Sequence, residues 1–133
     1  MRALGVDYGS KRIGLAISDP LGITAQALAT VANITELKQA IAPYAPLDKI
    51  VVGLPKEMSG QLGPQAVKVQ AFVVELEKEL GLPIITWDER LTTSQAEKML
   101  ISAGLSRQKR RKVIDRVAAA EILQSYLDQL PRT

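Results

Sequence analysis

Residues 1–19 (MRALGVDYGSKRIGLAISD) decide the fold class of this chain. Two short apolar runs, one just before Asp7 and one over residues 13–17, flank a polar stretch that contains Gly9. This pattern predicts a β-hairpin, in which Gly9 supplies the backbone freedom for the turn. Asp7 then lies where a buried strand reaches the surface. There it either caps the turn or serves as one ligand of a site at the edge of a sheet.

The size and composition of the chain predict one globular domain over residues 1–133. Hydrophobic residues make up 47% of the sequence, which is typical of a protein with a core. No apolar run approaches the roughly 20 residues of a membrane span, and the N-terminus has no signal-peptide pattern. We therefore expect a cytoplasmic protein without a membrane partner, and the absence of cysteine agrees with this.

Histidine and cysteine are both absent from the sequence, which narrows the possible chemistry. Zinc sites, cysteine nucleophiles and histidine-based triads are excluded. An enzyme built from the remaining residue types would use carboxylates to hold a hard cation such as Mg²⁺ or Mn²⁺.

Positive charge is concentrated in one part of the chain. Residues 90–116 contain eight Lys and Arg against two acids, a net charge of +6, and the other residues contain nine against twelve, so that the total is the observed +3. Five of the eight lie within residues 107–112. This asymmetry predicts a partner that carries phosphates, and the alternative is a solvated basic loop.

The pattern of apolar residues and the positions of glycine and proline predict an α/β protein. Residues 49–54 (KIVVGL) form a continuous apolar run, typical of a central strand buried on both faces. Thr92 or Thr93 would cap a helix. The other expected elements are strands at 27–31 and 83–87, and helices at 35–42, 64–80, from 92 or 93 to about 103, and from about 112 to 130.

Asp115 is the most informative position of the last helix. An apolar stripe at i, i+3, i+4, i+7, i+8 and i+11 begins at Ala119, and extending it back by four residues puts Asp115 on the same face. A carboxylate that faces a core is costly unless it is paired or bound to a metal. The alternative is a half-exposed Asp stabilised by the helix dipole.

Three carboxylate positions therefore occupy comparable places: Asp7, the pair Asp88 and Glu89, and Asp115. In an open sheet with helices on both faces, the carboxyl ends of parallel strands converge on one edge. Acids that meet there repel one another unless a cation lies between them, and two such ions suit phosphodiester hydrolysis.

Four motifs in order give the chain a family resemblance. It resembles the YqgF (RuvX) family, nucleases of the ribonuclease H-like superfamily that are related to the Holliday-junction resolvase RuvC. The resemblance implies a five-stranded mixed sheet in the order 3-2-1-4-5, with strands one to three antiparallel and helices on both faces. The motifs are Val6-Asp7-Tyr8-Gly9 through Arg12-Ile13-Gly14, Val51-Val52-Gly53-Leu54-Pro55, Asp88-Glu89-Arg90-Leu91-Thr92-Thr93, and Asp115-Arg116-Val117-Ala118-Ala119 through Ile122-Leu123.

The resemblance also implies which residues act. Asp7 and Asp115 match the family's first-strand and last-helix aspartates, and Glu89 is our choice for the middle acid, with Asp88 as its alternative because only one of the two can face the site. One departure from the wider superfamily is that the strand Val-Val-Gly-Leu-Pro carries no carboxylate. The expected nucleic-acid contacts are Arg12 and Arg90 at the scissile phosphate, Ser10 as a donor to it, and Arg107, Lys109, Arg110, Arg111 and Lys112 along the backbone.

The implied activity is a metal-dependent endonuclease that processes the 5′ end of pre-16S rRNA in ribosome biogenesis. The alternatives are a Holliday junction resolvase acting on branched DNA, and a ribosome assembly factor that binds nucleic acid without cutting it. A nucleotide-dependent ATPase is disfavoured, because the chain has no room for the second domain that such enzymes close over the nucleotide. The protein would be a monomer or a homodimer, since a junction resolvase needs two active sites.

Overall fold

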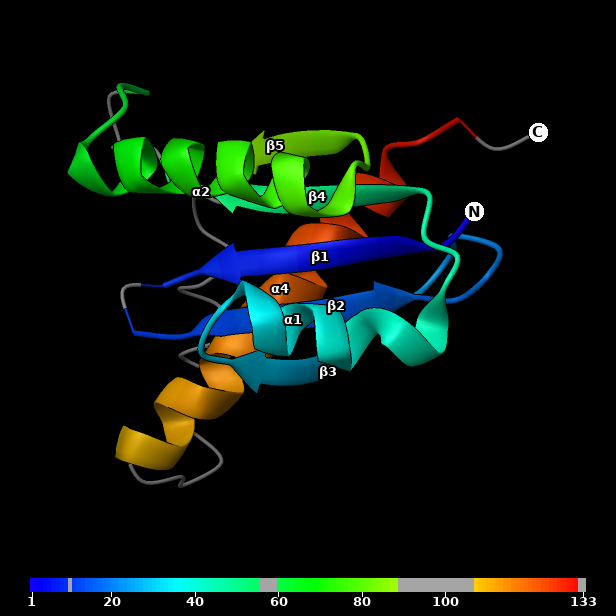
Figure 1. Cartoon of the computed structure of the whole chain (residues 1–133), viewed down its shortest axis with the longest axis horizontal. Coiled ribbons are helices and arrows are strands. Elements are labelled where there is room, and N and C mark those ends of the chain that lie inside the picture. Colours follow the sequence, from blue (N-terminus) through cyan, green and yellow to red (C-terminus); the bar gives the residue numbers. More distant parts are fainter. Residues whose placement is uncertain (10, 56–59, 89–106, 132–133) are drawn as a thin grey trace.

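The computed structural model describes residues 1–9, 11–55, 60–88 and 107–131, with the backbone alone over residues 107–115. A five-stranded sheet in the order β3-β2-β1-β4-β5 forms its centre (Figure 1). β1 pairs antiparallel with β2, β2 antiparallel with β3, and β4 lies parallel to both β1 and β5. This confirms the predicted strand order. The strands are β1 (Ala3–Tyr8), β2 (Ile13–Ser18), β3 (Ala25–Val31), β4 (Lys49–Leu54) and β5 (Ile84–Asp88).

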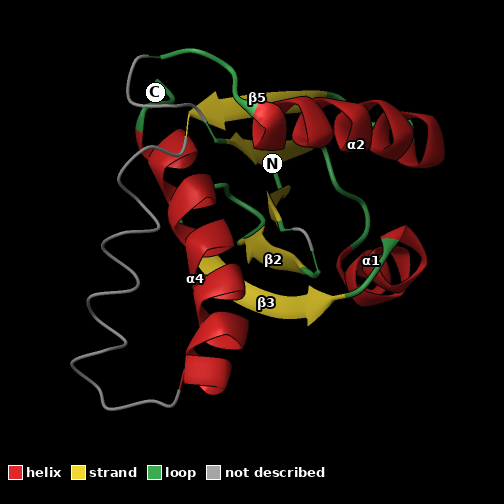
Figure 2. Cartoon of the chain, turned by 90° about the vertical axis from the view of Figure 1, so that its left-hand side faces the viewer, coloured by secondary structure: helices red, strands yellow, loops and turns green. Residues whose placement is uncertain are grey.

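Helices cover both faces of the sheet (Figure 2). One face carries α1 (Ile34–Ile41), followed by the 3₁₀ turn η1 (Ala42–Tyr44), and α2 (Pro64–Leu80); the other face carries α4 (Arg107–Asp128). The Asn33 side chain caps α1 by accepting from the Glu36 N–H, and Gly81 ends α2 in the left-handed conformation. The helix predicted from residue 92 or 93 to about 103 lies outside the described residues.

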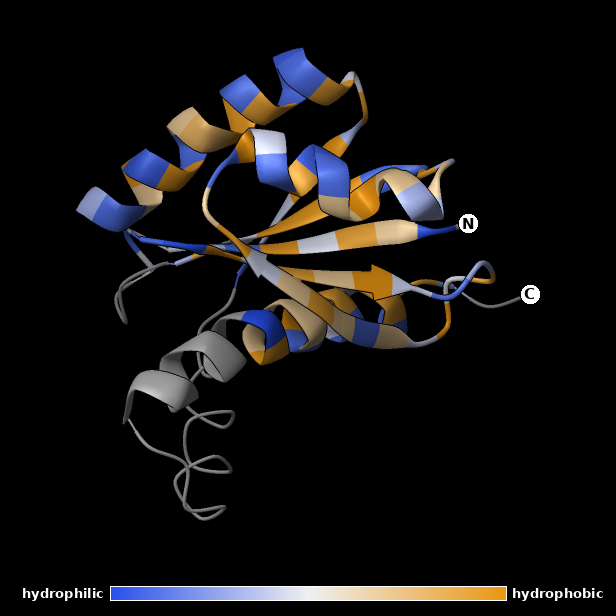
Figure 3. Cartoon of the chain, turned by 60° about the horizontal axis from the view of Figure 1, so that its bottom comes forward, coloured by the Kyte–Doolittle hydropathy of each residue, from blue (hydrophilic) through white to orange (hydrophobic). Residues whose placement is uncertain are grey.

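The hydrophobic strands lie between the two layers of helices (Figure 3), and side-chain alternation divides the core between the two faces of the sheet. Leu4, Val6 and Val52 belong to the cluster beneath α1 and α2. Ala3 and Val51 belong to the cluster beneath α4, together with its apolar stripe. Along β1, therefore, odd-numbered residues face α4 and even-numbered residues face α1 and α2.

Two predicted details differ from the structure. The last helix begins at Arg107, five residues before the predicted start, because Arg, Lys and Gln are good helix formers and the basic run continues the helix. Gly9 does not adopt a positive φ. It is needed instead for close packing in the turn, where its N–H donates to the Arg12 carbonyl and a Cβ atom would lie 2.8 Å from that oxygen.

In the described residues, no helix combines the length and the apolar character that crossing a bilayer requires.

Candidate active site

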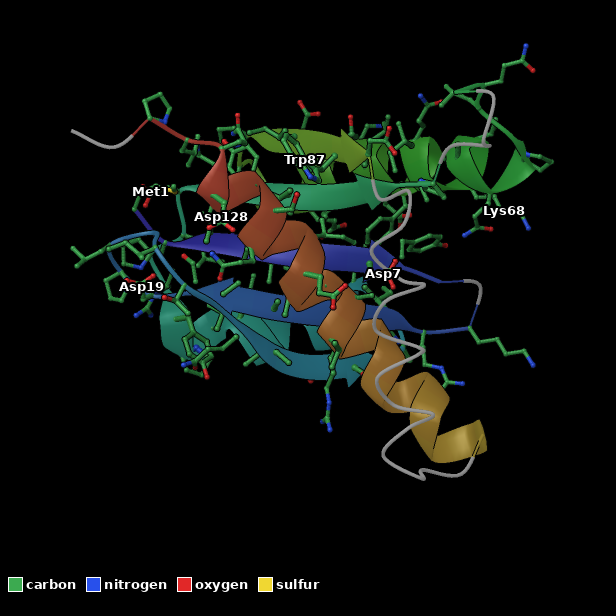
Figure 4. The ribbon with its side chains drawn as sticks, turned by 180° about the vertical axis from the view of Figure 1, so that it is seen from behind. Met1, Asp7, Asp19, Lys68, Trp87 and Asp128 are labelled. Carbon is green, nitrogen blue, oxygen red and sulfur yellow. The ribbon has the colours of Figure 1, made fainter. Side chains whose placement is uncertain are left out.

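Asp7 lies near the end of β1 and shares the parity of Ala3 and Gly5, so it belongs to the face that α4 covers. Figure 4 shows it at the end of the sheet opposite to Met1 and Asp128. The side chain is half-buried and has an interaction partner in the structure. The prediction that Asp7 ends a buried strand is thus confirmed in its geometry, while its role as a ligand stays a prediction.

Glycines surround Asp7 on its face of the sheet. Gly14 is its partner on β2. On the other side Val6 pairs with Val52, and continuing that register by one residue sets Gly53 beside Asp7. Gly5 precedes it by two residues on the same face. Gly14 and Gly53 place no side chain beside the Asp7 carboxylate, whereas the space over Gly5 is taken by α4.

The path of α4 is fixed at the start of the sheet and in the middle of β1. Its C-terminal half lies over the strand starts, where the Tyr126 hydroxyl accepts a 3.1 Å hydrogen bond from Lys49 Nζ and Gln124 Oε1 accepts one of 2.9 Å from the Ala25 N–H. Further along β1, a Cβ atom on Gly5 would lie 2.7 Å from Leu123 Cβ and 2.8 Å from the Ala119 carbonyl oxygen. The helix therefore packs directly on the β1 backbone at Gly5.

This contact sets the position of Asp115 in the fold. Residue 115 shares the helix face of Ala119 and lies one turn nearer the start of α4, just as Asp7 lies two residues beyond Gly5 on β1. Both steps measure roughly 6 Å and run toward the same end of the sheet. The backbones that carry Asp7 and Asp115 thus lie toward the same end of the sheet, while the start of α4 runs on past β3 (Figure 1), and the Asp115 side chain lies outside the described part of the structure.

The structure assigns a face of the sheet to Asp88 but does not describe Glu89. Asp88 closes β5 opposite Leu54, and Leu54 is buried in the cluster beneath α1 and α2. Ile85 and Trp87 pack on the α4 side, so alternation assigns Asp88 to the opposite face from Asp7. Glu89 lies outside the described residues. With Glu89 and the Asp115 side chain not described, the described side chains contain no group of three acids that could hold a metal ion.

The predicted phosphate-binding residues are spread over three segments. Arg12 precedes β2 and, with Lys11, lines a cavity of about 340 Å³ at the end of the sheet. Arg107, Lys109, Arg110, Arg111 and Lys112 form the first turns of α4, which extend past β3 at the edge of the sheet (Figure 1). Ser10 and Arg90 lie outside the described residues.

Polar contacts that the sequence analysis missed fasten α4 to the parallel half of the sheet. The Trp87 indole N–H donates to Ser125 Oγ at 3.1 Å, and its ring meets that of Tyr126 edge-on at 5.5 Å. Lys49 Nζ lies 5.5 Å from the centre of the Tyr126 ring. The signal in the sequence that could have predicted these contacts is Trp87 at the end of a predicted strand, together with Ser125 and Tyr126 on the last helix.

Comparison with known proteins identifies the family. A sequence model of RuvX, described as Holliday junction resolvase, matches residues 1–129. The chain belongs to the RuvX family. It is 54% identical to a protein of Geobacillus kaustophilus (96% of this chain, 98% of the other) and 52% identical to one of Moorella thermoacetica (98% and 96%). Both relatives bear the name "Putative pre-16S rRNA nuclease". The family and these names confirm the prediction of a nuclease.

Solved structures confirm the fold of this RuvX chain. RuvC of T. thermophilus in complex with a Holliday junction substrate superposes with a TM-score of 0.56 and covers 97% of both chains at 15% identity. A second structure of Thermus thermophilus RuvC gives 0.53 at 14% identity. At such low identity the likeness shows a shared fold, which is the predicted ribonuclease H-like one.

Proposed function

We propose that this RuvX chain acts over its whole length as a single nuclease domain, a divalent-cation-dependent endonuclease that processes the 5′ end of pre-16S rRNA. The observation that carries the proposal is the approach of α4 to β1 at Gly5, which brings the backbones of Asp7 and Asp115 to one end of the sheet. The names of the relatives favour the rRNA precursor as the substrate. Such a substrate agrees with a cytoplasmic location.

The residues fit a hard divalent cation by their chemistry. Asp7, Glu89 and Asp115 offer oxygen donors, which Mg²⁺ and Mn²⁺ prefer, and the chain has no histidine or cysteine that would favour a softer metal. Gly14 and Gly53 carry no side chain that would cover the Asp7 carboxylate from the neighbouring strands. Glu89 is the preferred middle acid, because alternation assigns Asp88 to the other face. When bound, the cation supplies a Lewis acid for the scissile phosphate.

The remaining polar residues hold the substrate. Arg90 contacts the scissile phosphate and Ser10 donates a hydrogen bond to it, and Arg12 binds a phosphate of the strand at or next to the scissile bond. The basic first turns of α4 bind the nucleic-acid backbone without reading bases, and the positive end of the helix dipole adds to their attraction for phosphates. Aromatic residues make up only 4% of the chain, so binding is mainly electrostatic.

Cleavage assays test the proposal with a matched pair of variants. Asp7→Asn removes the charge at the proposed site, and Asp128→Asn makes the same change at the far end of the sheet (Figure 4). Wild type and both variants are incubated with labelled precursor rRNA in Mg²⁺, Mn²⁺ or EDTA. We expect cation-dependent cutting that Asp7→Asn abolishes and Asp128→Asn leaves unchanged. Binding of the precursor without cutting by the wild type would instead indicate an assembly factor.

A Holliday junction resolvase is the second candidate. The description of the family model and the shared fold with RuvC favour it. Four-way DNA junctions in the same assay, together with the mass of the protein in solution, distinguish the two. A resolvase cuts the junction in paired positions and is a dimer, because it needs two active sites, whereas end processing of rRNA needs only one.

A further inference from the structure

Two adjoining cavities lie where β1 ends, β2 starts and β3 leads into α1. Figure 1 shows that these chain segments lie at one end of the sheet. The Tyr8–Phe72 pocket, of about 330 Å³, lies between the start of α1 and the middle of α2. The Lys11–Arg12 pocket, of about 340 Å³, lies beside the end of β3. Ala32 lines both, so the two are neighbours. Each has the size of a small-ligand site.

The Tyr8–Phe72 pocket combines aromatic rings with carboxylates. The two rings are stacked, with centroids 4.2 Å apart and planes 24° from parallel, and Tyr8 is only half-buried. Glu75 and Glu79 form the α2 wall, and Lys38 pairs with Glu79 at 3.0 Å. Such a pocket suits a flat ring that carries an amino group, which stacks on an aromatic side chain and donates to a carboxylate. The same carboxylates repel a phosphate.

The Lys11–Arg12 pocket has the opposite preference. Lys11 is exposed, and Arg12 and Thr30 add a guanidinium and a hydroxyl group. The pocket's acid, Glu36, is occupied in the cap of α1, where its Oε1 accepts from the Ala32 N–H at 3.1 Å. The positive end of the α1 dipole lies at the same place. These groups together attract an anion such as a phosphate.

We propose that the two pockets together bind one unpaired nucleotide of a nucleic-acid strand. Its base lies in the Tyr8–Phe72 pocket and its phosphate in the Lys11–Arg12 pocket. Glu75 makes the site prefer bases with an exocyclic amine, such as cytosine, over uracil. The inference rests on the proposed function only in taking nucleic acid as the ligand.

The position of this site relative to Asp7 gives it a role. Tyr8 follows Asp7 directly on β1 and points to the opposite face of the sheet. A strand cut beside Asp7 therefore reaches the pockets by passing over the end of the β1–β2 hairpin. Holding one unpaired nucleotide there fixes the position of the bond presented to Asp7, so the enzyme requires single-stranded character next to the cut.

Phe72 provides a clean probe, because it is the single phenylalanine of the sequence. Its ring signals are followed by NMR in EDTA while cytidine 5′-monophosphate, uridine 5′-monophosphate or inorganic phosphate is added. We expect saturable shifts with the cytidine nucleotide, about tenfold weaker binding of the uridine nucleotide, and no shift of Phe72 with phosphate. Equal shifts with phosphate alone, or none with either nucleotide, would overturn the proposal.

Exposed residues supply variants that leave the core intact. Glu75→Gln should abolish the preference for the cytidine nucleotide, and Lys11→Gln should lower the affinity for both nucleotides severalfold. Glu77→Gln and Lys68→Gln, exposed on α2 and outside both pockets, are the matched controls and should bind as the wild type does. If each variant behaves like its control, the pockets are not the binding site.

A short single-stranded oligocytidine distinguishes a strand from a free nucleotide. The oligomer should move the same Phe72 signals and bind more tightly than the mononucleotide, because its other phosphates contact the basic start of α4. Equal affinity would mean that the pockets serve a free nucleotide, against the proposal. The Asp7→Asn protein should show the same shifts as wild type, so this result stands apart from the cleavage assay.

Discussion

Glu121 on α4 is a half-buried acid whose Oε2 atom makes no contact with solvent and has no hydrogen-bond partner among the described residues. Burial raises the pKa of this carboxyl above its usual 4.5. Well below pH 4.5 the carboxyl is protonated in both the folded and the unfolded chain, so its burial involves no charge. As the pH rises through the folded-state pKa, folding must bury a charge, and the protein loses stability.

Glu121→Gln therefore should make the protein more stable at pH 7, and the difference from wild type should vanish as the pH falls to about 4. Thermal unfolding from pH 4 to 8 measures this. Glu77→Gln, which removes one negative charge from the exposed surface of α2, is the control for the loss of charge itself. Identical unfolding midpoints of Glu121→Gln and wild type at pH 7 would contradict the burial argument.

At the scale of elements, the spacing between α4 and β1 depends on Gly5. A methyl group there would lie 2.7 Å from Leu123 Cβ, so Gly5→Ala must push the helix off the strand. Overpacking of this kind costs about 1–3 kcal/mol of the free energy of unfolding. It also moves the backbone of Asp115 away from Asp7, so we expect cleavage to fall further than the loss of folded protein explains.

The control is Ile50→Val in the cluster beneath α1 and α2, which costs about 0.5–1.5 kcal/mol without touching α4. Urea unfolding gives the stabilities, and cleavage is measured at a temperature where both variants are folded. Gly5→Ala with wild-type cleavage would show that the α4–β1 spacing does not set the site.

The elements themselves follow closely from the sequence. Gly81 stops α2 and Asn33 caps α1, because these residue types favour those backbone conformations locally. The early start of α4 was missed because a basic run is read as a loop when only apolar periodicity is counted. The part played by Gly5 and Gly14 was also missed, since a glycine within a strand shows its purpose only once the helix or strand beside it is known.

At the scale of the molecule, the order of the strands came from the family resemblance, because hydropathy shows which segments are strands but not which ones pair. The candidate site could likewise be predicted only in part. Chain position and alternation suffice to bring Asp7 and residue 115 to one end of the sheet and to assign Asp88 to the other face. The two pockets could not be foreseen, since they combine β1, α1 and α2, whose relative placement no local pattern contains.

The uneven charge of the molecule gives the last prediction. Replacing both Arg110 and Arg111 by Gln should weaken binding to nucleic acid of any sequence. It should also lower the slope of log affinity against log salt by about 1–2, because fewer counterions are released on binding when phosphate contacts are lost. Lys68→Gln with Lys78→Gln changes the net charge equally from the opposite side of the sheet, and should leave that slope nearly unchanged. Fluorescence anisotropy at several salt concentrations measures both. If the two double variants lose affinity equally, net charge alone attracts the nucleic acid and the start of α4 has no special part in binding.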